Sequence, residues 1–192
     1  MTIYIMLDTE TTGLDTRSAL AWDISMVAFN SKYEVLEEHC AIFGRHSNLW
    51  EPSTLAFAKK TYSEDVFAAA TTPLRFVDEI ERMDVVVQFI TKYTDKVGLK
   101  NVYLICNHVE FDWPILLRSI EDTYGKDTDA PELFHYQNKL DLQSLCRGRV
   151  GAHWASEYKE FRAANNGPAH TGLADCYSQI GMLQWFGVTL PV

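Results

Sequence analysis

The sequence predicts a single α/β domain in which a mixed β-sheet, with its first three strands antiparallel, is flanked by α-helices. Three strand-like runs open the chain, most of the remainder has helical spacing, and one fully apolar run lies between two helical segments. A chain of 192 residues is long enough for one well-cored domain and short for two. No repeat, low-complexity tract or linker divides it, so one domain is expected to cover residues 1–192.

The predicted strands begin near the N-terminus. Residues 3–8 form an apolar run, and residues 22–30 and 34–43 are strand-like segments joined at Asn30-Ser31-Lys32, which is typical of a hairpin turn. Residues 102–106 are a short apolar run, as expected for a central strand that is buried on both faces.

Helices are predicted on both sides of this central strand. One starts at Glu51-Pro52-Ser53-Thr54, and a longer one starts at Thr72-Pro73 and continues at near-helical spacing to Tyr93. Pro114 is tolerated in a helix over residues 111–124 because it falls in the first turn. The remaining predicted helices cover residues 141–147, 154–161 and 173–183.

Composition and charge exclude several classes of protein. With 47% hydrophobic and 12% aromatic residues the chain is globular, and it lacks a membrane-length apolar stretch and a signal peptide, so a cytoplasmic protein without membrane contact is expected. The four cysteines form no CxxC pair, which predicts free thiols. A net charge of −9 argues against a protein that slides along DNA, but not against one that grips a single nucleic-acid end through metal ions.

Asp8 and Glu10, at the end of the first predicted strand, are the first candidate metal ligands. Side chains alternate faces along a strand, so both carboxylates project from the same side. Two carboxylates at this spacing repel each other unless a cation lies between them. Their hard oxygen atoms suit Mg²⁺ or Mn²⁺ better than zinc.

Two distant segments supply further candidates. Asp112 follows the central strand, and sites in α/β folds collect at the carboxyl ends of strands. His170 precedes a predicted helix that contains Asp175, so the imidazole is free to reach the site while Asp175 acts as a ligand. Two cations held by the four acids would clamp the attacking and leaving oxygens of a phosphoryl displacement, and His170 would accept the proton of the attacking water.

Each candidate also has an ordinary structural explanation. Asp112 alone would be favoured in the first turn of a helix by the helix dipole, and only the joint occurrence of the set favours function. His108 competes with His170 as the base but is expected to line the cleft. Asp23 and Asp141 are expected to support the metal ligands or to cap a helix rather than to bind metal themselves. Aromatic side chains are expected to pack in the core more often than to stack on bases; these are Trp50, Trp154, Tyr158 and Phe161.

Taken together, three motifs of the chain resemble those of the DEDDh family of 3′→5′ exonucleases, which have an RNase H-like fold. The segment Leu7-Asp8-Thr9-Glu10-Thr11-Thr12-Gly13-Leu14 is similar to the first motif, Asn107-His108-Val109-Glu110-Phe111-Asp112 to the second, and His170 with Asp175 to the third. The resemblance spans residues 3–183, and residues 50–55 and 140–145 are most similar to the phage DexA-type subgroup. Gly172 is a departure, since the third motif usually has alanine there.

The resemblance implies a role for each matching position. Asp8, Glu10 and Asp175 would hold one metal ion and Asp8 with Asp112 a second; Mg²⁺ is expected, with Mn²⁺ as a substitute. The remaining matched residues would bind the terminal nucleotide and line its pocket: Thr11, Thr12, Gly13, Leu14, Asn107 and Phe111.

The function expected from the sequence is therefore removal of nucleoside 5′-monophosphates from the 3′ end of a single-stranded nucleic acid. DNA is preferred because of the DexA-like features, and RNA, including very short oligomers, is the near alternative. A catalytically silent nucleic-acid-binding module and a metal-dependent phosphatase acting on small nucleotides are the competing classes. The sequence does not identify a protein partner or an oligomeric state.

Overall fold

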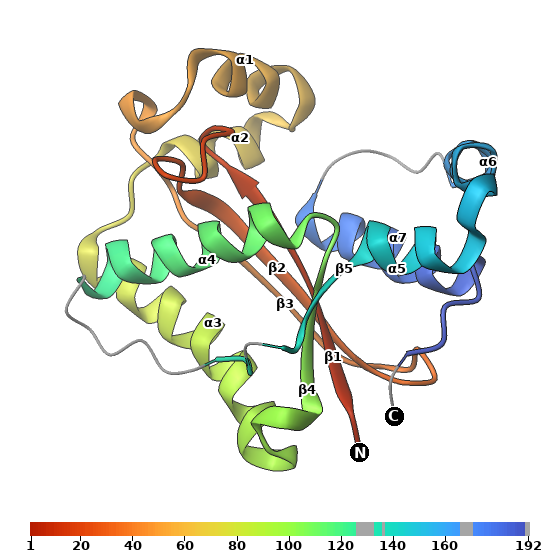
Figure 1. The fold of residues 1–192 in the computed structure, drawn as a ribbon. Coiled ribbons are helices and arrows are strands. Elements are labelled where there is room, and N and C mark those ends of the chain that lie inside the picture. The colour runs from red at the N-terminus through yellow and green to blue at the C-terminus, as the bar shows by residue number, and fades with distance from the viewer. Residues whose placement is uncertain (126–132, 136, 166–170, 191–192) are drawn as a thin grey trace.

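A mixed β-sheet forms the centre of the molecule, and helices cover both of its faces (Figure 1). The structure is a computed structural model that describes residues 1–125, 133–135, 137–165 and 171–190. Within these residues the strand order is β3-β2-β1-β4-β5. The strands are β1 (Ile3–Thr11), β2 (Ala21–Asn30), β3 (Val35–Ile42), β4 (Val102–Cys106) and β5 (Lys139–Asp141).

The α-helices are α1 (Pro52–Thr61), α2 (Glu64–Thr71), α3 (Phe76–Val97), α4 (Val109–Tyr124), α5 (Leu142–Val150), α6 (Trp154–Ala164) and α7 (Gly172–Trp185). Three short 3₁₀ helices are η1 (Ser47–Leu49), η2 (Leu99–Asn101) and η3 (Gly151–His153). None of the described helices combines the length and the apolar character that crossing a bilayer requires.

The predicted sheet is confirmed in its main features. β1 pairs with β2 and β2 with β3, both antiparallel, whereas β4 lies parallel to β1. A fifth strand, β5, was not predicted. It has three residues and pairs in parallel with β4, so its extended conformation depends on that neighbour rather than on a sequence pattern of its own.

Helix α2, over residues 64–71, was not predicted. The predicted long helix corresponds to α3, which begins at Phe76, a few residues after Thr72-Pro73. Ser63 ends the preceding segment, and its hydroxyl accepts a hydrogen bond from the Val66 amide at 3.4 Å. This N-cap, followed by Glu64 and Asp65 at the positive end of the helix dipole, is the local reason that α2 forms.

The alternation of side chains along β1 divides the core into two layers. Ile3, Ile5 and Leu7 lie in the cluster that includes residues of α3 and α4. Tyr4 and Met6 face the opposite way, into the cluster formed with α5, α6 and α7. The same alternation, continued along β1, decides which helices the polar residues at its end can meet.

A third, smaller cluster includes residues of α1 and α2, two helices that lie beside the end of β1 (Figure 1). Trp22 stacks on Trp50 with ring centroids 5.9 Å apart, and Tyr62 meets Trp22 edge-on at 5.0 Å. The predicted core role of Trp50 is therefore confirmed. This packing holds α1 next to the loop that follows β1.

Candidate functional site

The site begins where β1 extends beyond its neighbour β4. The parallel pairing ends at Leu7 and Cys106, yet β1 continues through Thr11 with β2 as its partner. The Thr9 amide is left without a strand partner on the β4 side and donates instead to Asp112 Oδ1 at 3.1 Å. The Thr9 hydroxyl donates to the same oxygen at 2.8 Å. The end of β1 is thus hydrogen-bonded to the first turn of α4. A crevice lies beside it, at the carboxyl ends of the parallel strands.

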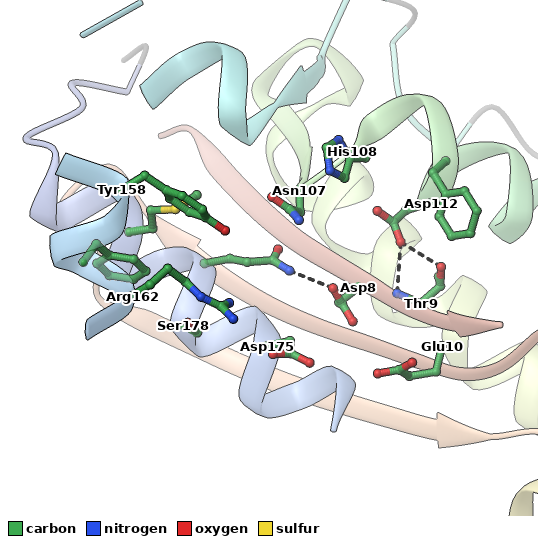
Figure 2. A pocket seen from close by; sticks show the side chains of 14 residues that line it. Asp8, Thr9, Glu10, Asn107, His108, Asp112, Tyr158, Arg162, Asp175 and Ser178 are labelled. Carbon is green, nitrogen blue, oxygen red and sulfur yellow. Dashed lines mark hydrogen bonds between the residues drawn. The ribbon is translucent and has the colours of Figure 1, made fainter. Parts of the chain in front are cut away.

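Three carboxylates meet in this crevice. Asp8 and Glu10 lie on the face of β1 that α7 covers, and Asp175 projects from the first turn of α7 (Figure 2). One oxygen atom from each of the three lies within 4.8 Å of the others. The helix is fixed at this point by the Thr171 hydroxyl, which accepts from the Ala174 amide at 3.4 Å.

Asp112 reaches the same crevice from the other layer of the molecule. Its helix, α4, packs on the face of the sheet opposite α7. Asp112 lines the same cavity as the three clustered acids, and Figure 2 shows it facing Asp8 across the strand end. Its Oδ1 accepts the two hydrogen bonds from Thr9, and the backbone of His108 also donates to its carboxylate.

Burial is the main reason that these carboxylates resist ionisation. Burial, followed by the nearby charges of Asp112, Glu10 and Asp175, raises the pKa of Asp8 well above its ordinary value. Burial raises the pKa of Glu10 to about 7, although the neighbouring Tyr62 hydroxyl favours the ionised form. Burial also raises the pKa of Asp112 to about 6 against the hydrogen bonds from Thr9.

A fifth acid, Asp23, supports the cluster from β2. Asp23 is paired with Glu10 across the β1–β2 ladder and is 4% exposed. It accepts a hydrogen bond from the Ser25 hydroxyl at 2.7 Å, and the backbone of Gly172 also donates to it. Burial raises the pKa of Asp23, and these donors oppose the shift. Asp23 thus attaches the start of α7 to the sheet, which agrees with the predicted supporting role.

Gly172 is required by this close approach of α7 to β2. A Cβ atom at position 172 would lie 2.8 Å from Ser25 Oγ and 3.0 Å from Asp23 Oδ1. Both distances are shorter than ordinary van der Waals contact. The departure from alanine at this position therefore has a steric cause in the chain itself.

A cavity of about 310 Å³ opens over the acids. Its polar wall includes the predicted residue Asn107 and also His108, which was expected to line the cleft. Arg162 is the sole arginine or lysine among the described lining residues, and Figure 2 shows it projecting from α6 toward the side where Ser178 and Asp175 lie. Tyr158 also lines the cavity, whereas Phe161 is 3% exposed and contributes mainly to the core.

A second, more apolar cavity of about 340 Å³ adjoins the first. The two share Thr9, Glu10 and Phe111 in their walls. The side chains of Leu14 and Phe57, which also line it, are 74% and 51% exposed. Large apolar side chains left this accessible beside a polar cluster are typical of a ligand surface.

The loop after β1 forms one edge of the apolar cavity. The carboxylate of Glu51 accepts hydrogen bonds from the amides of Leu14 at 3.0 Å and Asp15 at 3.4 Å. The Glu51 amide donates to the Thr12 carbonyl at 2.7 Å. Gly13 lets the carboxylate approach, since a Cβ atom there would lie 2.4 Å from Glu51 Oε1. One residue at the start of α1 therefore determines the shape of the loop.

The structure brings most of the predicted site residues together. Asp8, Glu10, Asp112, Asp175, Asn107 and Phe111 line the first cavity, and Thr11 and Leu14 line the second. Thr12 is 1% exposed and is packed inside the loop rather than facing a cavity. His170 lies outside the described residues. Asp141 caps α5 by accepting from the Ser144 amide at 2.7 Å, as expected.

Among the cavity-wall residues that were not predicted are Phe57, Arg162 and Gln179. Phe57 and Arg162 lie on helices whose sequences contain no motif, and Gln179 is on α7 four residues after Asp175. For Gln179 a signal was present, since residues four apart share a face of a helix. For the other two, only the packing of α1 and α6 around the strand end reveals the position.

The donor set fits a hard divalent cation. It consists of carboxylate oxygens, and the three closest carboxylates are near enough to share one ion. Their raised pKa values show that ionising all of them is costly without a compensating positive charge. A bound cation would relieve that cost directly.

No protein-family model matches the sequence, and no curated protein matches it with significant similarity. Solved structures do match. E. coli exonuclease I in complex with a dT13 oligonucleotide has a TM-score of 0.72 and 14% identity over 98% of this chain and 42% of that one. Exonuclease I from Methylocaldum szegediense has a TM-score of 0.63 and 16% identity over 96% of this chain and 40% of that one.

A further structure of exonuclease I, described as suggesting how processivity is achieved, has a TM-score of 0.70 and 16% identity over 100% of this chain and 42% of that one. At such low identity these matches establish the fold, which is RNase H-like as expected. This chain spans about 42% of the length of the exonuclease I chains that it matches.

Proposed function

We propose that this protein is a metal-dependent 3′→5′ exonuclease that acts on single-stranded nucleic acid and releases nucleoside 5′-monophosphates. The observation that carries the proposal is the cluster of the Asp8, Glu10 and Asp175 carboxylates, which line one cavity, with Glu10 also lining the second cavity that adjoins it. A scissile phosphate at the acids would have room for a nucleotide on either side. The fold shared with exonuclease I supports the same reading.

The residues divide into three tasks. Asp8, Glu10, Asp112 and Asp175 would hold two Mg²⁺ ions, with Mn²⁺ as a substitute; when bound, the ions neutralise the phosphate and stabilise the charge that develops on its oxygens. His170 remains the proposed general base. Thr9 fixes the orientation of Asp112, and Asp23 fixes the start of the helix that carries Asp175.

The second cavity favours a polymer over a small nucleotide. Each cavity is in the size range of an individual ligand pocket, and they differ in character. The apolar one offers Leu14, Phe57 and Phe111 to a base, while the polar one offers Arg162 to a phosphate. A phosphatase acting on mononucleotides would need only one of them.

Among polymers, single-stranded DNA is the proposed substrate and RNA the alternative. Solved neighbours include exonuclease I bound to dT13 and dA16 oligonucleotides, which supports single-stranded DNA. The assignment to the phage DexA-type subgroup, which rests on residues 50–55 and 140–145, is part of this proposal.

The test uses single-stranded DNA and RNA labelled at the 5′ end, with Mg²⁺, Mn²⁺ or EDTA. Stepwise shortening of the labelled strand is expected with either cation and not with EDTA, and a 3′-phosphate should block it. Asp8→Ala should abolish shortening. Asp95→Ala, which removes an exposed acid of α3 outside both cavities, should leave the rate unchanged.

Other outcomes of the same assay point to the competing functions. Tight retention of an uncut label would favour a silent binding module. Release of inorganic phosphate from mononucleotides, without shortening of the polymer, would favour the phosphatase. Faster shortening of RNA than of DNA would reverse the proposed order of substrates.

A further inference from the structure

Gln179 makes the closest described contact to Asp8. Its Nε2 donates a hydrogen bond to Asp8 Oδ1 at 2.7 Å, drawn as the dashed line to Asp8 in Figure 2. Gln179 lines the same cavity and follows Asp175 by four residues, so α7 presents both side chains on one face. The helix therefore contributes to the acid cluster twice, once through a carboxylate and once through a hydrogen-bond donor.

The hydrogen bond determines the orientation of the amide. The NH₂ group donates to Asp8, so the carbonyl oxygen at the other end of the amide faces away from it. Gln179 is 9% exposed, and its Oε1 receives no hydrogen bond from any described residue. A buried acceptor without a donor costs free energy. The hydrogen bond to Asp8 is therefore made while the carbonyl oxygen of the same amide has no partner among the described residues.

We infer that Gln179 is a positioning residue: by holding Oδ1 of Asp8 it presents the second carboxylate oxygen to the cation shared with Glu10 and Asp175. The inference rests on the proposed function, since it assigns a role within that metal site. Gln179 contacts neither substrate nor metal and acts through Asp8.

Substitution by leucine separates this role from simple packing. Leucine has a similar volume, cannot donate to Asp8, and removes the buried acceptor that has no donor. Gln179→Leu is therefore expected to weaken Mn²⁺ binding by roughly 10- to 100-fold, as is usual when the partner of a ligand is lost. The melting temperature of the metal-free protein should be unchanged or higher, because a buried unpaired oxygen has been removed.

The measurement is calorimetric titration of the purified full chain with Mn²⁺ in the absence of nucleic acid, beside thermal unfolding in EDTA. Gln184→Leu is the matched control, because Gln184 is an exposed glutamine of the same helix that lines neither the acid cavity nor the apolar one. Its Mn²⁺ affinity should equal that of the wild type. Gln179→His, which restores a donor, should recover part of the lost affinity.

The outcomes distinguish the inference from the proposed function. Wild-type protein that binds no Mn²⁺ would contradict the metal site itself. Wild-type protein that binds Mn²⁺ and shortens DNA, together with a Gln179→Leu variant of equal affinity, would overturn only the inference. A variant that melts earlier without a change in affinity would also overturn it, since that result describes a packing residue.

Discussion

Single side chains at the start of α7 are packed without spare volume. Ser25, Asp23 and Gly172 meet where the helix lies against β2, and the site acid Asp175 follows within the first turn. A change of one methyl group at position 172 must therefore move the helix or the strand, and with it the carboxylate.

Gly172→Ala is expected to lower the free energy of unfolding by about 1–3 kcal/mol, the usual cost of an overpacked core. The matched control is Gly181→Ala on the same helix, where a Cβ atom would meet nothing within 4 Å. That variant should gain up to about 1 kcal/mol from helix propensity. Urea unfolding measures both, and equal changes in the two variants would contradict the steric explanation.

Arg162 allows a prediction about substrate binding. Arg162→Ala should raise KM for a single-stranded oligonucleotide about tenfold with little change in kcat, because one charged hydrogen bond to phosphate is lost. The difference from wild type should shrink as salt increases. Lys159→Ala, which removes an exposed cation of the same helix, provides the control. A drop in kcat alone would mean that the guanidinium acts on the reaction rather than on binding.

At the scale of elements, the loop after β1 is shaped by a residue of a different segment. Glu51, which precedes α1, accepts from the Leu14 and Asp15 amides. Its removal leaves those donors without their partner and frees the loop that carries Leu14. The loop is thus coupled to the position of α1 through one carboxylate.

Glu51→Ala is expected to lower kcat/KM by about tenfold, corresponding to the loss of roughly one charge-assisted hydrogen bond. Glu51→Gln keeps an acceptor oxygen and should retain most of the activity. Hydrogen exchange at the Leu14 amide provides an independent measurement, since protection there should fall in the alanine variant only. Unchanged exchange in both variants would show that the loop holds its shape by other contacts.

The sequence was sufficient for elements with a strong periodic pattern and insufficient for short ones. β1 and β4 were predicted from continuous apolar runs, and β2 and β3 from strand-like segments on either side of a hairpin turn. β5 has only three half-buried residues, and the short helix α2 was not predicted because the Ser63 cap was overlooked.

The same distinction applies to the candidate site. Asp8, Glu10, Asp112 and Asp175 belong to recognisable motifs, and the structure brings all four to one cavity. Arg162 and Phe57 reach the cavities only because α6 and α1 pack around the strand end, and that packing depends on contacts between distant segments. The hydrogen bond from the Thr9 amide to Asp112 likewise depends on where β4 ends, which no local sequence pattern indicates.

For the molecule as a whole, the acid cluster links stability to pH. The folded protein holds the pKa of Glu10 at about 7 against an ordinary 4.5, and the pKa of Asp112 at about 6 against 3.8. Between the ordinary and the raised values the folded state binds more protons than the unfolded state. Stability of the metal-free protein therefore falls as pH rises through that window.

The melting temperature in EDTA is expected to decrease from pH 5 to pH 8. Adding Mg²⁺ or Mn²⁺ at pH 8 should restore much of the loss, since a bound cation favours the ionised carboxylates and stabilises the state that binds it. Asp8→Asn should melt higher than wild type in EDTA at pH 8 and respond less to the metal. A melting temperature in EDTA that rises across this range would contradict the raised pKa values.

The alternation of side chains along β1 has a consequence for insertions and deletions. Odd-numbered residues of β1 from Ile3 to Leu7 face α3 and α4, and the even-numbered Tyr4 and Met6 face α5, α6 and α7. Deleting one residue between Ile3 and Leu7 would exchange the two sets and turn both motif acids away from Asp175. Lengthening the hairpin between β2 and β3 would leave this parity intact, so length variants are expected to be tolerated there and selected against in the first strand.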